Sequence, residues 1–119
     1  MVLLEFSITP LEKGASVSQY VARSLELVEA SGLDYRLHAM GTIVEGELDD
    51  CLALLKKCIE AMAADCERIS CTAKLDYRRG HAGRLDSKVT SVEEKLGRKL
   101  KTICGRRNTS PSKRPRRAR

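Results

Sequence analysis

Two hydrophobic repeats, one of period two and one of helical period, alternate along the first 100 residues and restrict the folds open to this chain. The alternation is strictest from Arg68 to Arg78, so this segment is predicted to be a β-strand with one apolar and one polar face. Three earlier segments show the same alternation: Val2 to Ile8, Leu33 to His38 and Thr42 to Glu47. Met40-Gly41 separates the last two, which are therefore expected to form a hairpin.

Apolar residues at helical spacing predict two long helices between these strands. The first is expected to begin at Ser16, which forms a capping box with Gln19, and to end at Ser31-Gly32. The second is expected from about Asp49 to Ala64. Their apolar stripes are Val17, Tyr20, Val21, Leu25 and Val28 in the first, and Cys51, Leu52, Leu55, Ile59 and Met62 in the second. A second capping box, formed by Ser91 and Glu94, predicts a short helix through Leu96.

The resulting order is β-α-β-β-α-β followed by a terminal helix, which is typical of an α+β, ferredoxin-like βαββαβ sandwich. Residues 1–100 are expected to form this single domain. In such a fold both helices cover one face of the sheet, and the other face is left for solvent, a ligand, another subunit or a nucleic acid. That face is predicted to carry Glu5, Ser7, Arg36, His38, Glu45, Ser70, Thr72, Lys74 and Asp76.

The positive charge of the chain is concentrated in its last residues. Residues 101–119 hold eight of the 22 basic residues and none of the 16 acidic ones, so the rest of the chain is close to neutral although the whole carries a formal charge of +6. This Arg/Lys/Ser/Pro composition predicts a disordered basic tail. We expect the tail to be dispensable for folding and ligand binding, and able to contact a polyanion. Lys113 to Arg117 also resembles a nuclear-import signal.

The remaining sequence signals favour a cytoplasmic protein that is not an enzyme. The amino-terminal segment lacks the basic region of a secretory signal, and no apolar run approaches the length of a membrane span, so we expect no membrane partner. The five cysteines show no CxxC spacing and are expected to be reduced, with Cys51 and Cys58 in the core and no metal site. GxSxG, HExxH and P-loop motifs are absent from the sequence, so we expect no catalytic residues.

Three motifs identify a resemblance. They are Glu5-Phe6-Ser7-Ile8-Thr9-Pro10, the stretch from His38 to Glu47 with its MGTIVEGE core, and Asp76-Tyr77-Arg78-Arg79-Gly80 followed by Gly83-Arg84-Leu85. Together they resemble the thiamine-binding protein family over about residues 1–100. Two departures are Ala39, where relatives often have proline, and the basic tail.

The resemblance implies a ferredoxin-like subunit that pairs sheet to sheet in a homodimer or homotetramer. It also implies non-enzymatic binding of thiamine, or of a related hydroxymethylpyrimidine compound, in pockets near subunit contacts. No further cofactor is expected. The alternatives are a structural or regulatory oligomer, and weak nucleic-acid binding through the tail. A sheet platform for RNA is disfavoured because the predicted open face carries no aromatic side chain.

Glu45 is the leading candidate for a ligand contact, because a carboxylate suits a cationic thiazolium ring. The other interpretation is an intersubunit salt bridge from Glu45 to Lys74 or Arg78. Thr42 is a candidate for a hydrogen bond to a ring nitrogen. Further candidate ligand contacts are Met40 as a soft apolar wall, Ser7 and Thr72 as hydroxyls, and Ser18 near a helix N-terminus, where anions bind.

Asp76, Arg78, Arg84 and Lys74 are expected at the subunit interface, where arginine and carboxylate groups pair well. His38 has no partner visible in the sequence, so an acid–base role for it is disfavoured.

Overall fold

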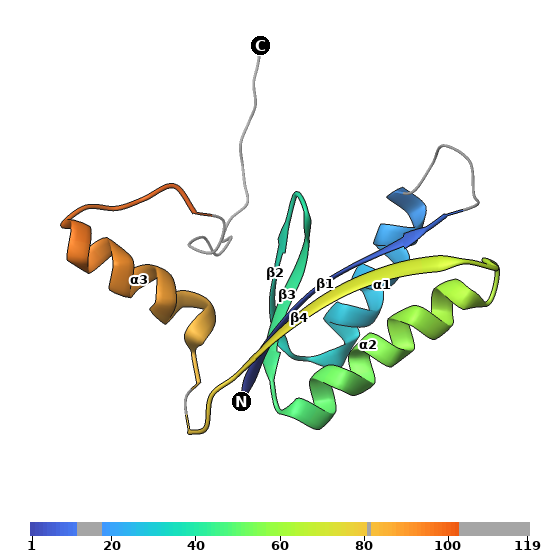
Figure 1. The fold of residues 1–119 in the computed structure, drawn as a ribbon, viewed down its shortest axis with the longest axis horizontal. Helices are drawn as coiled ribbons and strands as arrows, with labels where there is room; N and C mark the ends of the chain where they lie inside the picture. The colour runs from blue at the N-terminus through green and yellow to red at the C-terminus, as the bar shows by residue number, and fades with distance from the viewer. Residues whose placement is uncertain (12–17, 81, 103–119) are drawn as a thin grey trace, which may run out of the picture.

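The computed structural model describes residues 1–11, 18–80 and 82–102, and its elements follow the predicted order (Figure 1). In chain order they are β1 (Val2–Pro10), α1 (Ser18–Ser31), β2 (Asp34–His38), β3 (Gly41–Gly46), α2 (Leu48–Ala63), β4 (Ile69–Tyr77) and α3 (Arg84–Leu96). The basic tail beyond Thr102 and the capping residue Ser16 lie outside the described residues. None of the described helices is long and apolar enough to cross a membrane.

The four strands form one antiparallel sheet in the order β2-β3-β1-β4, and the predicted α+β, ferredoxin-like fold is confirmed. β1 lies in the middle, but its two neighbours have different lengths. It pairs with β4 from Val2 to Pro10, whereas its pairing with β3 ends at Phe6, opposite Thr42. Among the described residues, the last part of β1 therefore pairs with a strand on one side only, and a notch opens beside it.

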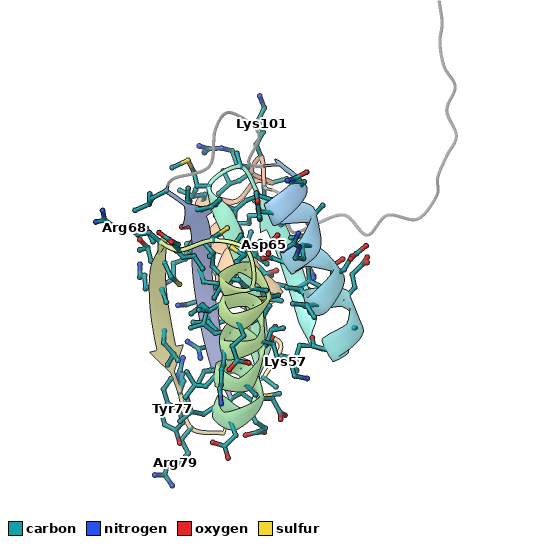
Figure 2. The ribbon with its side chains drawn as sticks, turned by 90° about the vertical axis from the view of Figure 1, so that its right-hand side faces the viewer. Lys57, Asp65, Arg68, Tyr77, Arg79 and Lys101 are labelled. Atoms are coloured by element: carbon teal, nitrogen blue, oxygen red, sulfur yellow. The ribbon has the colours of Figure 1, made fainter. Side chains whose placement is uncertain are left out.

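The core lies between the sheet and the helices α1 and α2, which run side by side over one face (Figure 2). It is built from the alternate side chains of β1 that were predicted to share a face, together with helix residues. Its buried members include Val2, Leu4, Phe6, Ile8, Tyr20, Val28, Val44, Cys51, Leu54, Cys58 and Met62. Cys51 and Cys58 are fully buried as predicted, and burial raises the pKa of both thiols.

Both predicted helix stripes are partly wrong. In α2, Leu52 is 45% exposed, and Leu54 takes its place in the core. In α1, Val21 is 41% exposed whereas Ser24 is buried. The buried residues of α1 thus run Tyr20, Ser24, Val28 at intervals of four. Val21 and Leu25 lie on the flank of this line, beside the notch where β3 has ended.

The third helix begins seven residues before Ser91. The predicted helix start, at a capping box formed by Ser91, is therefore wrong. α3 starts at Arg84, directly after Gly83, which has a left-handed φ of 69° and no side-chain cap. The cap comes from another strand, because the Arg84 N–H donates to Glu45 Oε2 at 3.0 Å. α3 lies on the opposite side of the sheet from α1 and α2 (Figure 1).

Candidate functional site

The notch exposes hydrogen-bonding groups of the β1 backbone. Arg78 N–H donates to the Met1 carbonyl at 3.3 Å, and Leu11 N–H donates to the Arg68 carbonyl at 3.0 Å. Odd-numbered residues of β1 therefore direct their backbone groups toward β4. The backbone N–H and C=O groups of successive strand residues point alternately to the strands on either side. Ile8, an even-numbered residue, therefore directs its N–H and C=O away from β4 and into the notch.

The β2–β3 turn explains why β3 does not extend as far as Ile8. Extending the register by two residues would place Met40 opposite Ile8. The chain turns back there through Ala39 and Met40, and the Met40 N–H donates to His38 Nδ1 at 3.2 Å. Within the described part of the chain, no backbone hydrogen bond from Ile8 toward this side is formed.

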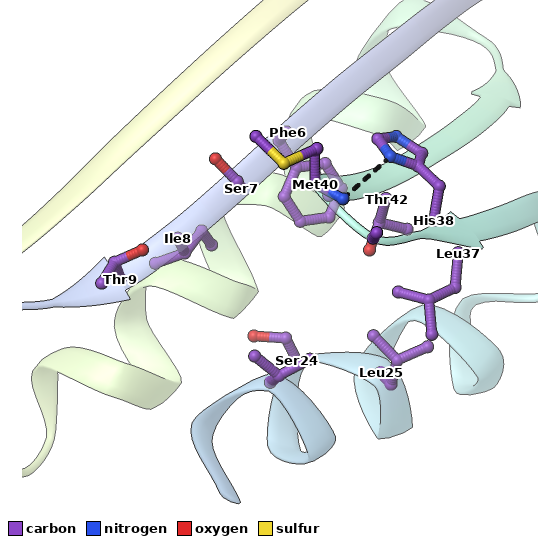
Figure 3. Close-up of a pocket in the computed structure, with 13 residues that line it drawn as sticks. Phe6, Ser7, Ile8, Thr9, Ser24, Leu25, Leu37, His38, Met40 and Thr42 are labelled. Carbon is purple, nitrogen blue, oxygen red and sulfur yellow. Dashed lines mark hydrogen bonds between the residues drawn. The ribbon is translucent and has the colours of Figure 1, made fainter. Parts of the chain in front are cut away.

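A cavity of about 300 Å³ fills the notch between β1, the β2–β3 turn and α1 (Figure 3). Its walls are mainly apolar, and the described residues that line it include no aspartate, glutamate, lysine or arginine. The lining residues are Phe6, Ser7, Ile8, Thr9, Val21, Ser24, Leu25, Leu37, His38, Ala39, Met40, Gly41 and Thr42. The size and the mixture of apolar walls with a few polar groups are those of a small-molecule site.

Ser24 brings a buried hydroxyl to this cavity. Its residue exposure is 7%, and its Oγ has no hydrogen-bond partner among the described residues. Figure 3 shows Ser24 in the space between α1 and β1, on the same side as Ile8. Burying a hydroxyl without a hydrogen-bond partner costs about 1–3 kcal/mol of folding free energy. A serine on the apolar stripe of α1 is therefore unfavourable unless its hydroxyl gains a partner.

His38 joins the turn to the rim of the cavity. Its Nδ1 accepts the Met40 N–H, which leaves the proton of the neutral ring on Nε2, and Nε2 lies 3.1 Å from Glu5 Oε2. Both ring nitrogens are thus engaged, so His38 fixes the turn that closes one side of the cavity. This partner could not be predicted from the sequence, because Glu5 lies on a different strand.

The structure divides the predicted ligand residues into two groups. Met40, Thr42 and Ser7 line the cavity. Thr42 is buried on the helix side of the sheet, and Met40 is 83% exposed at the mouth. Thr72 is the register partner of Ser7 on β4 and does not line the cavity. The side chain of Ser18 lies outside the described residues.

Glu45 lies on the opposite face of the sheet and does not line the cavity. It is 5% exposed, and its carboxylate accepts the Arg84 N–H. A carboxylate at a helix N-terminus is favoured both by the free N–H groups and by the helix dipole. Within one subunit, Glu45 therefore caps α3, while Thr42 faces the cavity on the other side of the sheet.

Two of the predicted interface residues, Asp76 and Arg84, meet inside the subunit. Arg84 Nη2 and Lys88 Nζ each lie 2.8 Å from Asp76 Oδ2. Hydrogen bonds from Lys88 and Arg84 lower the pKa of Asp76 to about 2. A third ion pair, Arg36 to Asp86 at 3.2 Å, ties β2 to the first turn of α3. We call Glu45, Asp76, Arg84 and Lys88 the α3 anchor.

Two further predicted interface residues have places on the sheet. Lys74 lies opposite Glu5 in the register of β4 and β1, and the backbone of Arg78 bonds Met1. Contact of Lys74, Arg78 or the α3 anchor with a second copy stays a prediction.

Two polar groups of the cavity, the Ser24 hydroxyl and the Ile8 backbone, were not predicted from the sequence. Ser24 was detectable in principle, because a serine four residues from both Tyr20 and Val28 interrupts an apolar stripe. The open backbone of Ile8 had no such signal, since it depends on where β3 stops. The structure brings no group of three or more histidine, cysteine, aspartate or glutamate side chains into metal-binding geometry among the residues it describes.

Comparison with known proteins gives a consistent family. A family model described as thiamine-binding protein matches residues 4–93. The chain is 36% identical over 93 residues to the UPF0045 protein MJ1052 of Methanocaldococcus jannaschii. The matched segment covers 78% of this chain and 93% of that protein. It is 37% identical over 96 residues to the UPF0045 protein Mb1933 of Mycobacterium bovis, covering 80% and 94%.

Solved structures agree. The crystal structure of MJ1052 matches with a TM-score of 0.72 at 35% identity, covering 78% of this chain and 96% of that one. A candidate thiamine biosynthesis/salvage protein of Thermotoga maritima matches with a TM-score of 0.68 at 20% identity, covering 76% and 97%. The second likeness concerns the fold alone.

Proposed function

The chain belongs to the thiamine-binding protein family, and we propose that it binds thiamine or a related hydroxymethylpyrimidine compound in the cavity beside β1, without transforming it. The coarse thiamine-related role rests on the family. The choice of cavity rests on one observation, the buried Ser24 hydroxyl without a described partner inside a mainly apolar cavity of about 300 Å³. Such a group is costly in an empty protein and useful in an occupied one.

Binding without catalysis is supported by the chemistry of the lining. His38 is the one lining residue, among those described, with an imidazole that could act as an acid or base, and both of its ring nitrogens are engaged. Among the described lining residues, no carboxylate lies in the cavity wall to activate the hydroxyls of Ser24 and Thr42.

We further propose that the subunits assemble as a homodimer or homotetramer with the cavities near the contacts. The second half of α3 supports this, because its apolar residues Val92 and Leu96 are 49% and 48% exposed in the single subunit and could pack against a second copy. Equilibrium sedimentation tests it, and a monomer at micromolar concentration would contradict it. A cytoplasmic location is proposed because the four described cysteines are free and three of them are buried.

The site is tested by calorimetric titration of thiamine and of hydroxymethylpyrimidine into three proteins. Val21→Trp places a large ring at the cavity wall from a position that is already 41% exposed, so the fold should accept it. Glu45→Gln is the matched control on the opposite face, because glutamine keeps an oxygen that can accept the Arg84 N–H. We expect Val21→Trp to weaken binding by more than about thirtyfold, or roughly 2 kcal/mol, and Glu45→Gln to bind like the unmodified protein.

Circular dichroism melts confirm that each variant is folded before it is titrated. Binding that survives Val21→Trp but is lost in Glu45→Gln would move the site to the α3 side of the sheet. Absence of binding by the unmodified protein would contradict the proposed function itself.

A further inference from the structure

The open backbone of Ile8 has a definite recognition pattern. An extended residue presents its N–H and its C=O on the same side, and in an antiparallel sheet it exchanges two hydrogen bonds with the residue opposite. Here the opposite position is vacated by the turn at Ala39 and Met40, so the donor and the acceptor of Ile8 face the cavity. A planar ligand with an adjacent acceptor and donor on one edge can take the place of the missing strand residue.

We infer that the cavity reads the amino edge of an aminopyrimidine through the N–H and C=O of Ile8 and the hydroxyl of Ser24, which act as its specificity determinants. This inference rests on the proposed function and names the part of the ligand that is recognised. The ring nitrogen next to the amino group accepts from the Ile8 N–H, and the amino group donates to the Ile8 carbonyl. The Ser24 hydroxyl, which can donate or accept, pairs with a further polar atom of the ring.

The surroundings favour a neutral flat ring over other ligands. Phe6, Leu25 and Leu37 give apolar walls, and the described lining has no lysine or arginine to neutralise a phosphate. A peptide strand added to this edge would need a longer run of free groups. Pro10, the next residue with the same direction as Ile8, has no N–H to offer, and the turn blocks the other end of the edge.

The orientation of the rest of the ligand follows from the charges at the rim. With its amino edge against Ile8, the ring can direct its 5-substituent toward the mouth, where Met40 is 83% exposed, while the 2-methyl group on the opposite side of the ring points into the apolar cavity. Glu5 stands beside the mouth through its contact with His38. A cationic substituent, such as the second ring of thiamine, would lie outside the apolar part of the cavity and near this carboxylate.

The test uses calorimetry with two probes, 4-amino-5-hydroxymethyl-2-methylpyrimidine and the same compound without its amino group. The variants are Ser24→Ala and its matched control Ser31→Ala on the same helix. The Ser31 hydroxyl is already partnered, because it donates to the Val28 carbonyl at 2.6 Å and accepts from the Leu33 N–H at 3.1 Å. Thermal midpoints are recorded without ligand.

We expect Ser24→Ala to weaken binding of the amino compound by about five- to tenfold, the value of one hydrogen bond, and to raise the thermal midpoint, since it removes an unsatisfied group. Ser31→Ala should do the reverse, lowering the midpoint and leaving affinity unchanged. The unmodified protein should bind the compound without its amino group at least about tenfold more weakly.

The failures of the two proposals differ. Ser24→Ala binding as tightly as the unmodified protein would overturn this inference while thiamine binding stands, and so would equal affinity for the two probes. A protein that binds neither the amino compound nor thiamine would overturn the proposed function and this inference with it.

Discussion

Buried polar side chains near the two ends of β1 differ in whether they have a hydrogen-bond partner. Near Val2, on the face away from α1 and α2, the carboxylate of Glu45 is buried and takes up the free N–H at the start of α3. Near Ile8, on the helix side, the hydroxyl of Ser24 is buried with no described partner, and the Ile8 backbone faces a cavity. A paired polar group thus holds an element in place, whereas unpaired groups gathered around a cavity mark a place for a ligand.

One atom at the anchor departs from this contrast. Arg84 Nε is buried and has no hydrogen-bond partner among the described residues. The other two nitrogens of the same guanidinium contact Asp76, one its carboxylate and one its carbonyl. Arg84 Nε does not line the cavity beside β1. An unpaired buried group therefore marks a ligand site only where it also lines a cavity, as Ser24 does.

The largest effect should follow removal of the paired carboxylate. Glu45→Ala leaves the Arg84 N–H buried without its charged acceptor, and we expect a loss of about 3 kcal/mol in the free energy of unfolding. Urea denaturation measures it. Glu47→Ala is the control, because Glu47 is exposed and makes no side-chain cap to α2; it should change stability by less than about 0.5 kcal/mol. Equal losses in the two variants would show that Glu45 does not anchor α3.

A smaller loss should follow a change at the hairpin that ends beside the notch. A Cβ on Gly41 would lie 2.8 Å from the Phe6 carbonyl oxygen, so Gly41→Ala must push β3 away from β1. We expect a cost of about 2 kcal/mol and weaker ligand binding, because the cavity wall moves. Gly97→Ala should cost only about 1 kcal/mol, for its left-handed φ of 74°, and should leave binding unchanged. Unimpaired binding by a destabilised Gly41→Ala protein would place the ligand elsewhere.

The smallest effect concerns pH at the anchor. The pKa of Asp76 is lowered from 3.8 to about 2 in the folded chain, so its contribution to stability is complete above about pH 4 and is lost as the pH falls toward 2. Because the side chain of Asp76 is 44% exposed, salt should weaken the effect. Thermal midpoints across this range should fall less steeply in Asp76→Asn than in the unmodified protein. Parallel pH profiles would show that Asp76 gains nothing from Arg84 and Lys88.

Most of the fold could be predicted from the sequence because strand and helix periods are local properties. The alternation from Ile69 to Tyr77 and the burial of Cys51 and Cys58 followed directly from spacing. The stripe of α2 was misplaced because leucines occupy two of its faces, so the pattern alone could not choose between Leu52 and Leu54. The start of α3 was missed because its cap is supplied by a strand 39 residues earlier in the chain.

The candidate site could be predicted only in part. The MGTIVEGE segment pointed to Met40 and Thr42, which do line the cavity. It also pointed to Glu45, which lies on the other face because side chains alternate along β3. The hydrogen-bonding edge of Ile8 arises from the unequal lengths of two strand pairings, a property of the assembled sheet that no local pattern in the sequence carries.

Ligand binding at the Ile8 backbone is tested most directly by following the amide of Ile8 during titration with 4-amino-5-hydroxymethyl-2-methylpyrimidine, using ¹H–¹⁵N correlation spectra. We expect the Ile8 amide proton to shift downfield on forming its new hydrogen bond. Amides of Ser24 and Met40 should move with it, while those of Arg84 and Lys88 stay in place. Saturable binding with shifts gathered around Arg84, and an unmoved Ile8 amide, would contradict it.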